Sequence, residues 1–121
     1  MALTITKIPD VRYYLGESGV MNGFTFTPGT SDYVTGGYPV TAASVELGYL
    51  VGGIMLGTSS TGATYLAQFV APTSLFGTTP AVGTSLNLKV VDSTSGGGAF
   101  TEVSASTNLS GVNFAALMLG W

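Results

Sequence analysis

Turn-forming residues punctuate this chain at short, regular intervals, and their spacing limits what it can fold into. Clusters of Gly, Pro, Asn and Asp recur about every 8–12 residues, the spacing of short antiparallel strands in a sandwich or barrel. Between them, apolar residues alternate with Thr, Asn or Lys, which is the period of a strand with one buried face. The sequence therefore predicts an all-β fold, a single-domain antiparallel β-sandwich of jelly-roll-like type over residues 1–121.

Individual strands follow from this alternation. Pro9-Asp10 is expected to end the first strand, and Gly52-Gly53 to form a bulge or a close backbone approach in the third. The fourth strand is apolar on both faces, as in a strand covered on both sides. The last strand has Asn113 as its only polar side chain, so it lies either in the centre of a sheet or in an interface. The expected strands are 2–6, 20–27, 49–56, 63–70, 86–90, 99–105 and 111–121.

Two segments depart from the strand pattern. The sequence predicts one short helical turn near 41–47, with Thr41 as the N-cap and Gly48 as the stop. Residues 72–83 contain two Pro and two Gly and are predicted to form a long loop. Leu75 and Phe76 in this loop either tuck under it or serve as a docking knob.

Charged side chains are scarce. Only 7% of the residues are charged, whereas a typical soluble domain has roughly 25%. Because charge keeps soluble proteins apart, two interpretations stand: much of the apparent surface is buried against other subunits, or Ser and Thr alone keep a monomer soluble. We favour the first interpretation.

The same composition excludes most chemistry. The chain has no His and no Cys, so a Ser-His-Asp triad, a Cys nucleophile and a His/Cys zinc site are impossible. Its six carboxylates lie beside turns and strand ends, where we expect solvated acids. With three cations and no long apolar run, neither nucleic-acid nor membrane binding is expected. We predict no enzyme, no catalytic residue, no metal and no cofactor.

Aromatic residues are the remaining candidates for function. Six Tyr and one Trp are compatible with a sugar-stacking platform, but they are equally the residues that anchor cores and protein interfaces. We favour packing. The interface candidates are Tyr33, Tyr38, Leu75, Phe76, Phe114, Leu117, Leu119 and Trp121.

One run carries a resemblance to a known family. Residues 33–43, Tyr-Val-Thr-Gly-Gly-Tyr-Pro-Val-Thr-Ala-Ala, resemble a signature of small structural proteins of tailed bacteriophages. The opening Ala-Leu-Thr-Ile-Thr at 2–6 and the closing Glu102-Val103, Thr107-Asn108-Leu109-Ser110 and 111–121 are also similar to that family. The likeness in order and spacing covers nearly the whole chain.

The resemblance implies a capsid decoration, or cement, protein. Such a protein is a β-sandwich homotrimer on the outer surface of the virion, made in the host cytoplasm, that bridges subunits of the major capsid protein and stabilises the head. The family has no catalytic residues to carry over. Two alternatives remain: a carbohydrate-binding or host-adhesion module of the virion, and a tail or head–tail subunit.

Overall fold

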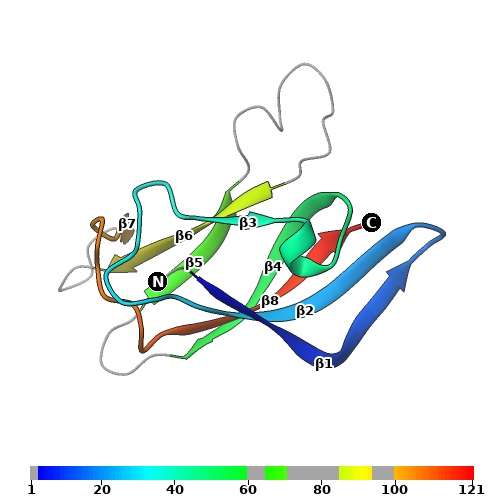
Figure 1. Ribbon diagram of the computed structural model, residues 1–121, viewed down its shortest axis with the longest axis horizontal. Coiled ribbons are helices and arrows are strands. Elements are labelled where there is room, and N and C mark those ends of the chain that lie inside the picture. Colours follow the sequence, from blue (N-terminus) through cyan, green and yellow to red (C-terminus); the bar gives the residue numbers. More distant parts are fainter. Residues whose placement is uncertain (1–2, 60–64, 71–84, 94–99) are drawn as a thin grey trace, which may run out of the picture.

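Two antiparallel sheets make up the part of the chain that the computed structural model describes, residues 3–59, 65–70, 85–93 and 100–121 (Figure 1). Sheet A contains, in spatial order, β1 (Thr4–Leu15), β2 (Gly19–Thr27), β8 (Asn113–Gly120) and β4 (Leu50–Ser59). Sheet B contains β3 (Tyr38–Thr41), β6 (Ser85–Ser93) and β5 (Tyr65–Val70), and β7 (Phe100–Glu102) pairs with β6.

The all-β sandwich expected from the sequence is confirmed. β1 and β2 pair as a hairpin at one edge of sheet A, and β8 lies between β2 and β4. β5 and β6 form a second antiparallel pair in sheet B. The observed strand orders, β1-β2-β8-β4 and β3-β6-β5, are more specific than the predicted jelly-roll-like type and take its place.

The core lies between the inner faces of the two sheets. β8 illustrates the alternation, because Phe114, Ala116 and Met118 are all 0% exposed, whereas the residues between them are half-buried. The β8 strand is therefore central in its sheet, one of the two positions predicted for it. The other large, fully buried side chains are Phe26, Tyr33, Val40, Val45, Leu50, Leu88, Val90 and Leu109.

One buried polar side chain ties sheet A to the helical turn η1 (Ala43–Val45). Asn22 on β2 is 0% exposed. Its amide nitrogen donates to the carbonyl oxygen of Val45 at 3.3 Å, and its amide oxygen accepts from Arg12 Nη1 at 3.3 Å. Both ends of the buried amide are thus paired, as burial requires.

The predicted helical turn is present, but its ends differ from the prediction. Ala42 is the N-cap, with no side-chain cap, and the turn ends at Glu46, which is left-handed (φ 59°), two residues before the predicted stop at Gly48. Thr41, one residue before the N-cap, still pairs with the turn, since its hydroxyl oxygen accepts from the Ser44 N–H at 3.3 Å.

The prediction that Pro9-Asp10 ends the first strand is wrong. β1 continues to Leu15, and its pairing with β2 shifts register between Lys7 and Arg12. A bulge absorbs the proline, because β1 is an edge strand whose outer N–H groups need no partner in the sheet. Asp10 takes the strained position in this bulge, with φ 63°.

Four other strands refine the predictions. β4 shifts register on both sides of Gly52-Gly53, between Leu50 and Gly52 and again between Met55 and Gly57, so the expected bulge is confirmed. β5 is not covered on both sides within the chain, because Leu66 is 44% and Val70 37% exposed. β3, which includes Pro39, was not predicted as a strand, and β7 is shorter than the strand predicted at 99–105.

Candidate functional site

The segment that carries the family resemblance forms a buried corner of the fold. Tyr33 and Tyr38 are 1% and 5% exposed, and their rings meet edge to face at 5.4 Å. Gly36 and Gly37 between them have φ of 96° and 101°, a region that favours glycine. A Cβ on Gly37 would lie 2.5 Å from the carbonyl oxygen of Leu88. The tight turn of this motif therefore requires glycine for its packing against β6.

A single carboxylate holds this corner to β7. Glu102 Oε1 accepts from the Tyr33 hydroxyl at 2.8 Å and from the Gly36 N–H at 2.6 Å, and Lys89 Nζ lies 3.5 Å from Oε2. Burial opposes the charge of Glu102, but the two hydrogen bonds and Lys89 outweigh it and hold the pKa of this carboxyl below its usual range. Glu102 is therefore a structural anchor, which corrects the expectation of a solvated acid.

Both tyrosines of the corner stay neutral. Burial, aided by the charge of Glu102, raises the pKa of Tyr33 to about 12. Its hydroxyl oxygen also accepts from the Val90 N–H at 3.1 Å. Burial and the hydrogen bond from its hydroxyl to Asp32 raise the pKa of Tyr38 as well. These groups brace the fold and offer no base or nucleophile at neutral pH.

Five of the eight interface candidates do not lie on the exposed surface that the structure describes. Tyr33, Tyr38 and Phe114 are in the core, because their positions face the opposite sheet or the buried corner. This corrects their assignment as surface contacts. Leu75 and Phe76 lie outside the described residues.

The other three candidates share one surface, the outer face of sheet A. Leu117 and Leu119 are half-buried and alternate with the core residues of β8. Trp121 stands two residues beyond Leu119, so strand alternation places it on the same face. Its N–H donates to Tyr49 O at 3.1 Å and its carbonyl accepts from the Tyr49 N–H at 2.9 Å, which extends the β4–β8 pairing by one residue pair.

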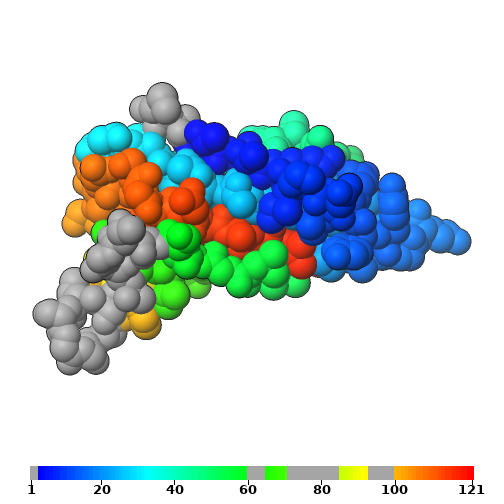
Figure 2. All heavy atoms as spheres, turned by 90° about the horizontal axis from the view of Figure 1, so that it is seen from below, coloured from blue at the N-terminus to red at the C-terminus, as the bar shows by residue number. Residues whose placement is uncertain are grey.

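Cross-strand pairing shows which other residues join them. In one row across the sheet, Tyr13 pairs with Met21 and Met21 with Leu119. In the next row, Leu117 lies between Gly23 and Ile54. A Cβ on Gly23 would lie 2.7 Å from Val11 Cγ1, so the Val11 side chain covers that position. Figure 2 shows β1 and β2 (blue), β8 (red) and β4 (green) side by side across one surface of the molecule.

We call this surface the apolar outer face. Its outward side chains are large, apolar or aromatic, and none of them is charged. Tyr13, Ile54 and Trp121 are 56%, 50% and 44% exposed. The face consists of Tyr13, Met21, Tyr49, Ile54, Leu117, Leu119 and Trp121.

Polar residues occupy the opposite end of the same sheet face. Thr25 lies between Thr6 and Ala115 in the third row. In the last row, the Thr27 hydroxyl donates to Asn113 Oδ1 at 2.6 Å. The face therefore changes from apolar to hydroxyl- and amide-bearing along the strands, although it carries no charge in either half.

Both edges of sheet A are poor templates for adding another strand. The β1 edge has a bulge with Pro9 and Asp10, and the β4 edge has two register shifts. Bulges, prolines and charges are devices that discourage edge-to-edge pairing. The face of sheet A is therefore better suited to protein contacts than its edges are.

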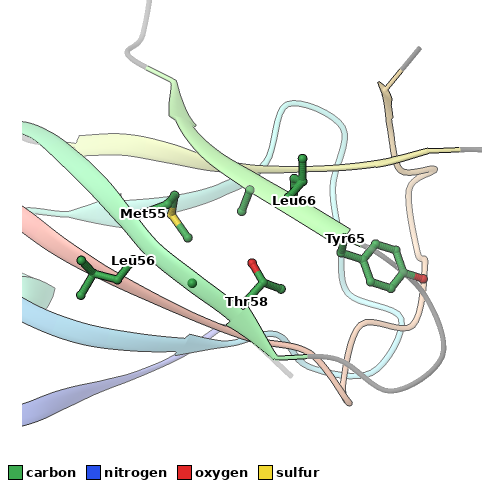
Figure 3. Close-up of a pocket in the computed structure, with 7 residues that line it drawn as sticks. Met55, Leu56, Thr58, Tyr65 and Leu66 are labelled. Carbon is green, nitrogen blue, oxygen red and sulfur yellow. The ribbon is translucent and has the colours of Figure 1, made fainter. Parts of the chain in front are cut away.

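A groove of about 480 Å³ lies between β4 and β5, lined by 55–58 and 65–67 (Figure 3). Met55 and Thr58 project from β4 toward β5, whereas the ring of Tyr65 turns away from the gap (Figure 3). Among the described residues of the lining, Tyr65 is the only titratable side chain, so these residues supply no pair of acid and base groups.

Sequence reasoning missed Tyr13, Met21, Tyr49 and Ile54 as members of the face. Tyr13 lies beyond Pro9-Asp10, outside every strand expected from the sequence, and only the register between strands brings the four residues together. The Val51 side chain, 52% exposed, lies in the β4 bulge, where a period of two cannot be extended from one side to the other.

The described residues contain no group of three or more Asp or Glu side chains placed to hold a metal ion. No helix in the described part of the chain is long and apolar enough to cross a membrane. No protein-family model, no curated protein and no solved structure matches the chain significantly.

Proposed function

We propose that this chain is a structural subunit that works by packing against other proteins and performs no catalysis. The observation that carries the proposal is the apolar outer face, a contiguous uncharged surface with an exposed Trp and two exposed Tyr. Aromatic residues are the anchors of protein interfaces, and interface cores are depleted in charge. Exposed contiguous apolar patches mark interaction sites.

The assembly that we propose is a phage head, with the chain as its decoration protein. The support is the resemblance of residues 33–43 to the family signature. The buried Tyr pair and the left-handed Gly36 and Gly37 provide a physical reason why such a signature keeps those residue types. In this proposal the partner is the major capsid protein, the oligomer is a homotrimer, and the location is the outer surface of the virion.

Such a protein stabilises the head by mass action. A subunit that binds the assembled shell, but not free capsid subunits, adds its binding free energy to the stability of the shell. Many copies on one particle act together, so that modest affinity at each site is sufficient. Nothing in this mechanism needs a cofactor or a titrating group.

Aromatic exposure alone also fits the alternative of a glycan-binding module. The Tyr49 and Trp121 rings, however, are 5.4 Å apart and inclined by 43°. They contact each other and do not form one flat platform. This geometry favours packing against protein over stacking against sugar.

The test is sedimentation with purified heads of the phage that encodes the chain, stripped of it beforehand. We expect saturable co-sedimentation, a gain in head stability to heat, and density for the chain on the outer surface by electron microscopy. A chain that stays in the supernatant contradicts the proposal. Binding to a glycan array, or assembly into rings or tubes, would support the adhesion or the tail alternative instead.

A further inference from the structure

We infer that the apolar outer face is where copies of this chain associate, so that its occupant is a second copy of the chain. This inference deepens the proposed function and rests on it in one respect: an assembly subunit has a reason to expose such a face. It adds the surface used and the chemistry of the partner.

Charge is the first argument for a second copy. A net charge on the face would oppose the association of copies, because every copy presents charge of the same sign. The chain carries a net charge of −3 and six acids, yet none of the outward residues of β2, β8 and β4 in sheet A is charged. The ion pairs lie elsewhere, Lys7 with Glu46 at 2.7 Å beside η1 and Lys89 with Glu102 at sheet B. A neutral face in an acidic chain suits contact with another copy of that chain.

Area is the second argument. The eight residues of β8 span about 26 Å, and four strands about 4.8 Å apart are about 19 Å wide. The flat area is then about 500 Å², before the relief of the side chains is added. A standard interface buries about 800 Å² on each partner. Two such faces bury about 1,000 Å² in total, which is about the least area that a specific interface needs.

The polarity gradient locates the contact along the strands. The apolar rows contain Leu117, Leu119 and Ile54, whereas the rows of Thr25 and of Thr27 with Asn113 are polar. Apolar area drives association and hydroxyl groups lose water when covered. The contact should therefore be centred on the apolar rows, with the Asn113 end of each sheet at its solvated rim.

The first experiment measures the mass of the chain in solution by light scattering. We expect a multiple of the single-chain mass, and a shift to single chains in Ile54→Lys at the same concentration, with at least about a tenfold weaker association. Thr6→Lys is the matched control, because Thr6 is also exposed on an edge strand of sheet A, at its polar end. It should keep the wild-type mass. Circular dichroism verifies that both variants are folded.

The second experiment uses the absence of cysteine from the chain. A bismaleimide cross-linker should join copies of Leu117→Cys and leave Asn113→Cys largely unjoined. Both sites lie on β8 and face outward, four residues apart, or about 13 Å. Since the wild type has no thiol, every cross-link reports the introduced residue.

The outcomes separate this inference from the proposed function. The inference is overturned if the wild type has the mass of a single chain, even if it binds heads. It is also overturned if the oligomer persists in Ile54→Lys and Leu117→Cys gives no cross-link. If the wild type is a single chain and Ile54→Lys abolishes its binding to heads, the apolar outer face binds the capsid. This result also overturns the inference. An oligomer that dissociates in Ile54→Lys but ignores heads supports the inference and contradicts decoration.

Discussion

Glu102 links three parts of the fold that are distant in sequence. It accepts hydrogen bonds from Tyr33 and Gly36 and lies near Lys89 on β6. Hydrogen bonds to a charged acceptor contribute more to stability than neutral ones. No sequence pattern separates this acid from the five others, since its partners are defined by the tertiary fold.

Replacing this carboxylate tests its role as an anchor. We expect Glu102→Gln to lower the free energy of unfolding by about 1–3 kcal/mol, because the amide keeps the shape but loses the charge. Urea denaturation followed by circular dichroism measures the change. Glu17→Gln, in the exposed β1–β2 turn, is the control and should stay within about 0.5 kcal/mol of the wild type. Equal effects of the two changes would contradict the anchor.

The Glu102 carboxylate also predicts that the free energy of unfolding falls at acid pH. Its pKa is lowered on folding, so the folded state binds a proton less readily than the unfolded state. The stabilisation is therefore present above the pKa of the unfolded chain and is lost as pH falls through the pKa of the folded state. We expect the difference in unfolding free energy between wild type and Glu102→Gln to shrink in acid. A difference that is constant between neutral and strongly acidic pH would exclude this linkage.

At the scale of elements, β4 and β5 meet where a glycine makes room for an aromatic ring. A Cβ on Gly53 would lie 2.5 Å from Phe69 Cδ2 and 3.0 Å from the sulfur of Met118. The Phe69 ring in turn packs edge to face on Phe26 at 5.6 Å. This contact closes the sandwich between β2, β4 and β5.

Adding one methyl group at this position should disturb the closure. We expect Gly53→Ala to destabilise the chain by about 1–3 kcal/mol, the usual effect of overpacking. The matched control is Gly52→Ala, where a Cβ has no neighbour within 4 Å. Thermal unfolding followed by circular dichroism compares the two variants. If both unfold at the same temperature, the close contact of Gly53 with Phe69 is not a constraint.

Local patterns predicted the elements better than their ends and surroundings. Alternation identified β2, β6 and β8, because each has one strictly buried face. The expectation that a proline ends a strand was wrong at Pro9. The outer N–H groups of an edge strand need no partner in the sheet, and a bulge takes up the distortion. Of the residues on the apolar outer face, only Leu117, Leu119 and Trp121 were among the interface candidates, because the sequence of a single strand does not show its register with its neighbours.

At the scale of the whole molecule, the shortage of charged side chains is evident on the outer face of sheet A. Within the described residues, the ion pairs lie beside η1 and at the buried corner of Tyr33 and Tyr38. The outer face of sheet A is left with apolar, aromatic and hydroxyl side chains. A single Trp, Trp121, lies at the apolar end of this face and is 44% exposed. Its fluorescence therefore reports directly on whether the face is covered.

The decisive measurement is the emission maximum of Trp121 over a dilution series. If copies cover the apolar outer face, emission is blue-shifted at high concentration and moves to the red as the chain is diluted. Ile54→Lys should emit at the red position throughout, and Thr6→Lys should follow the wild type. Red emission of the wild type at every concentration, with no shift on dilution, would contradict burial of the face between copies.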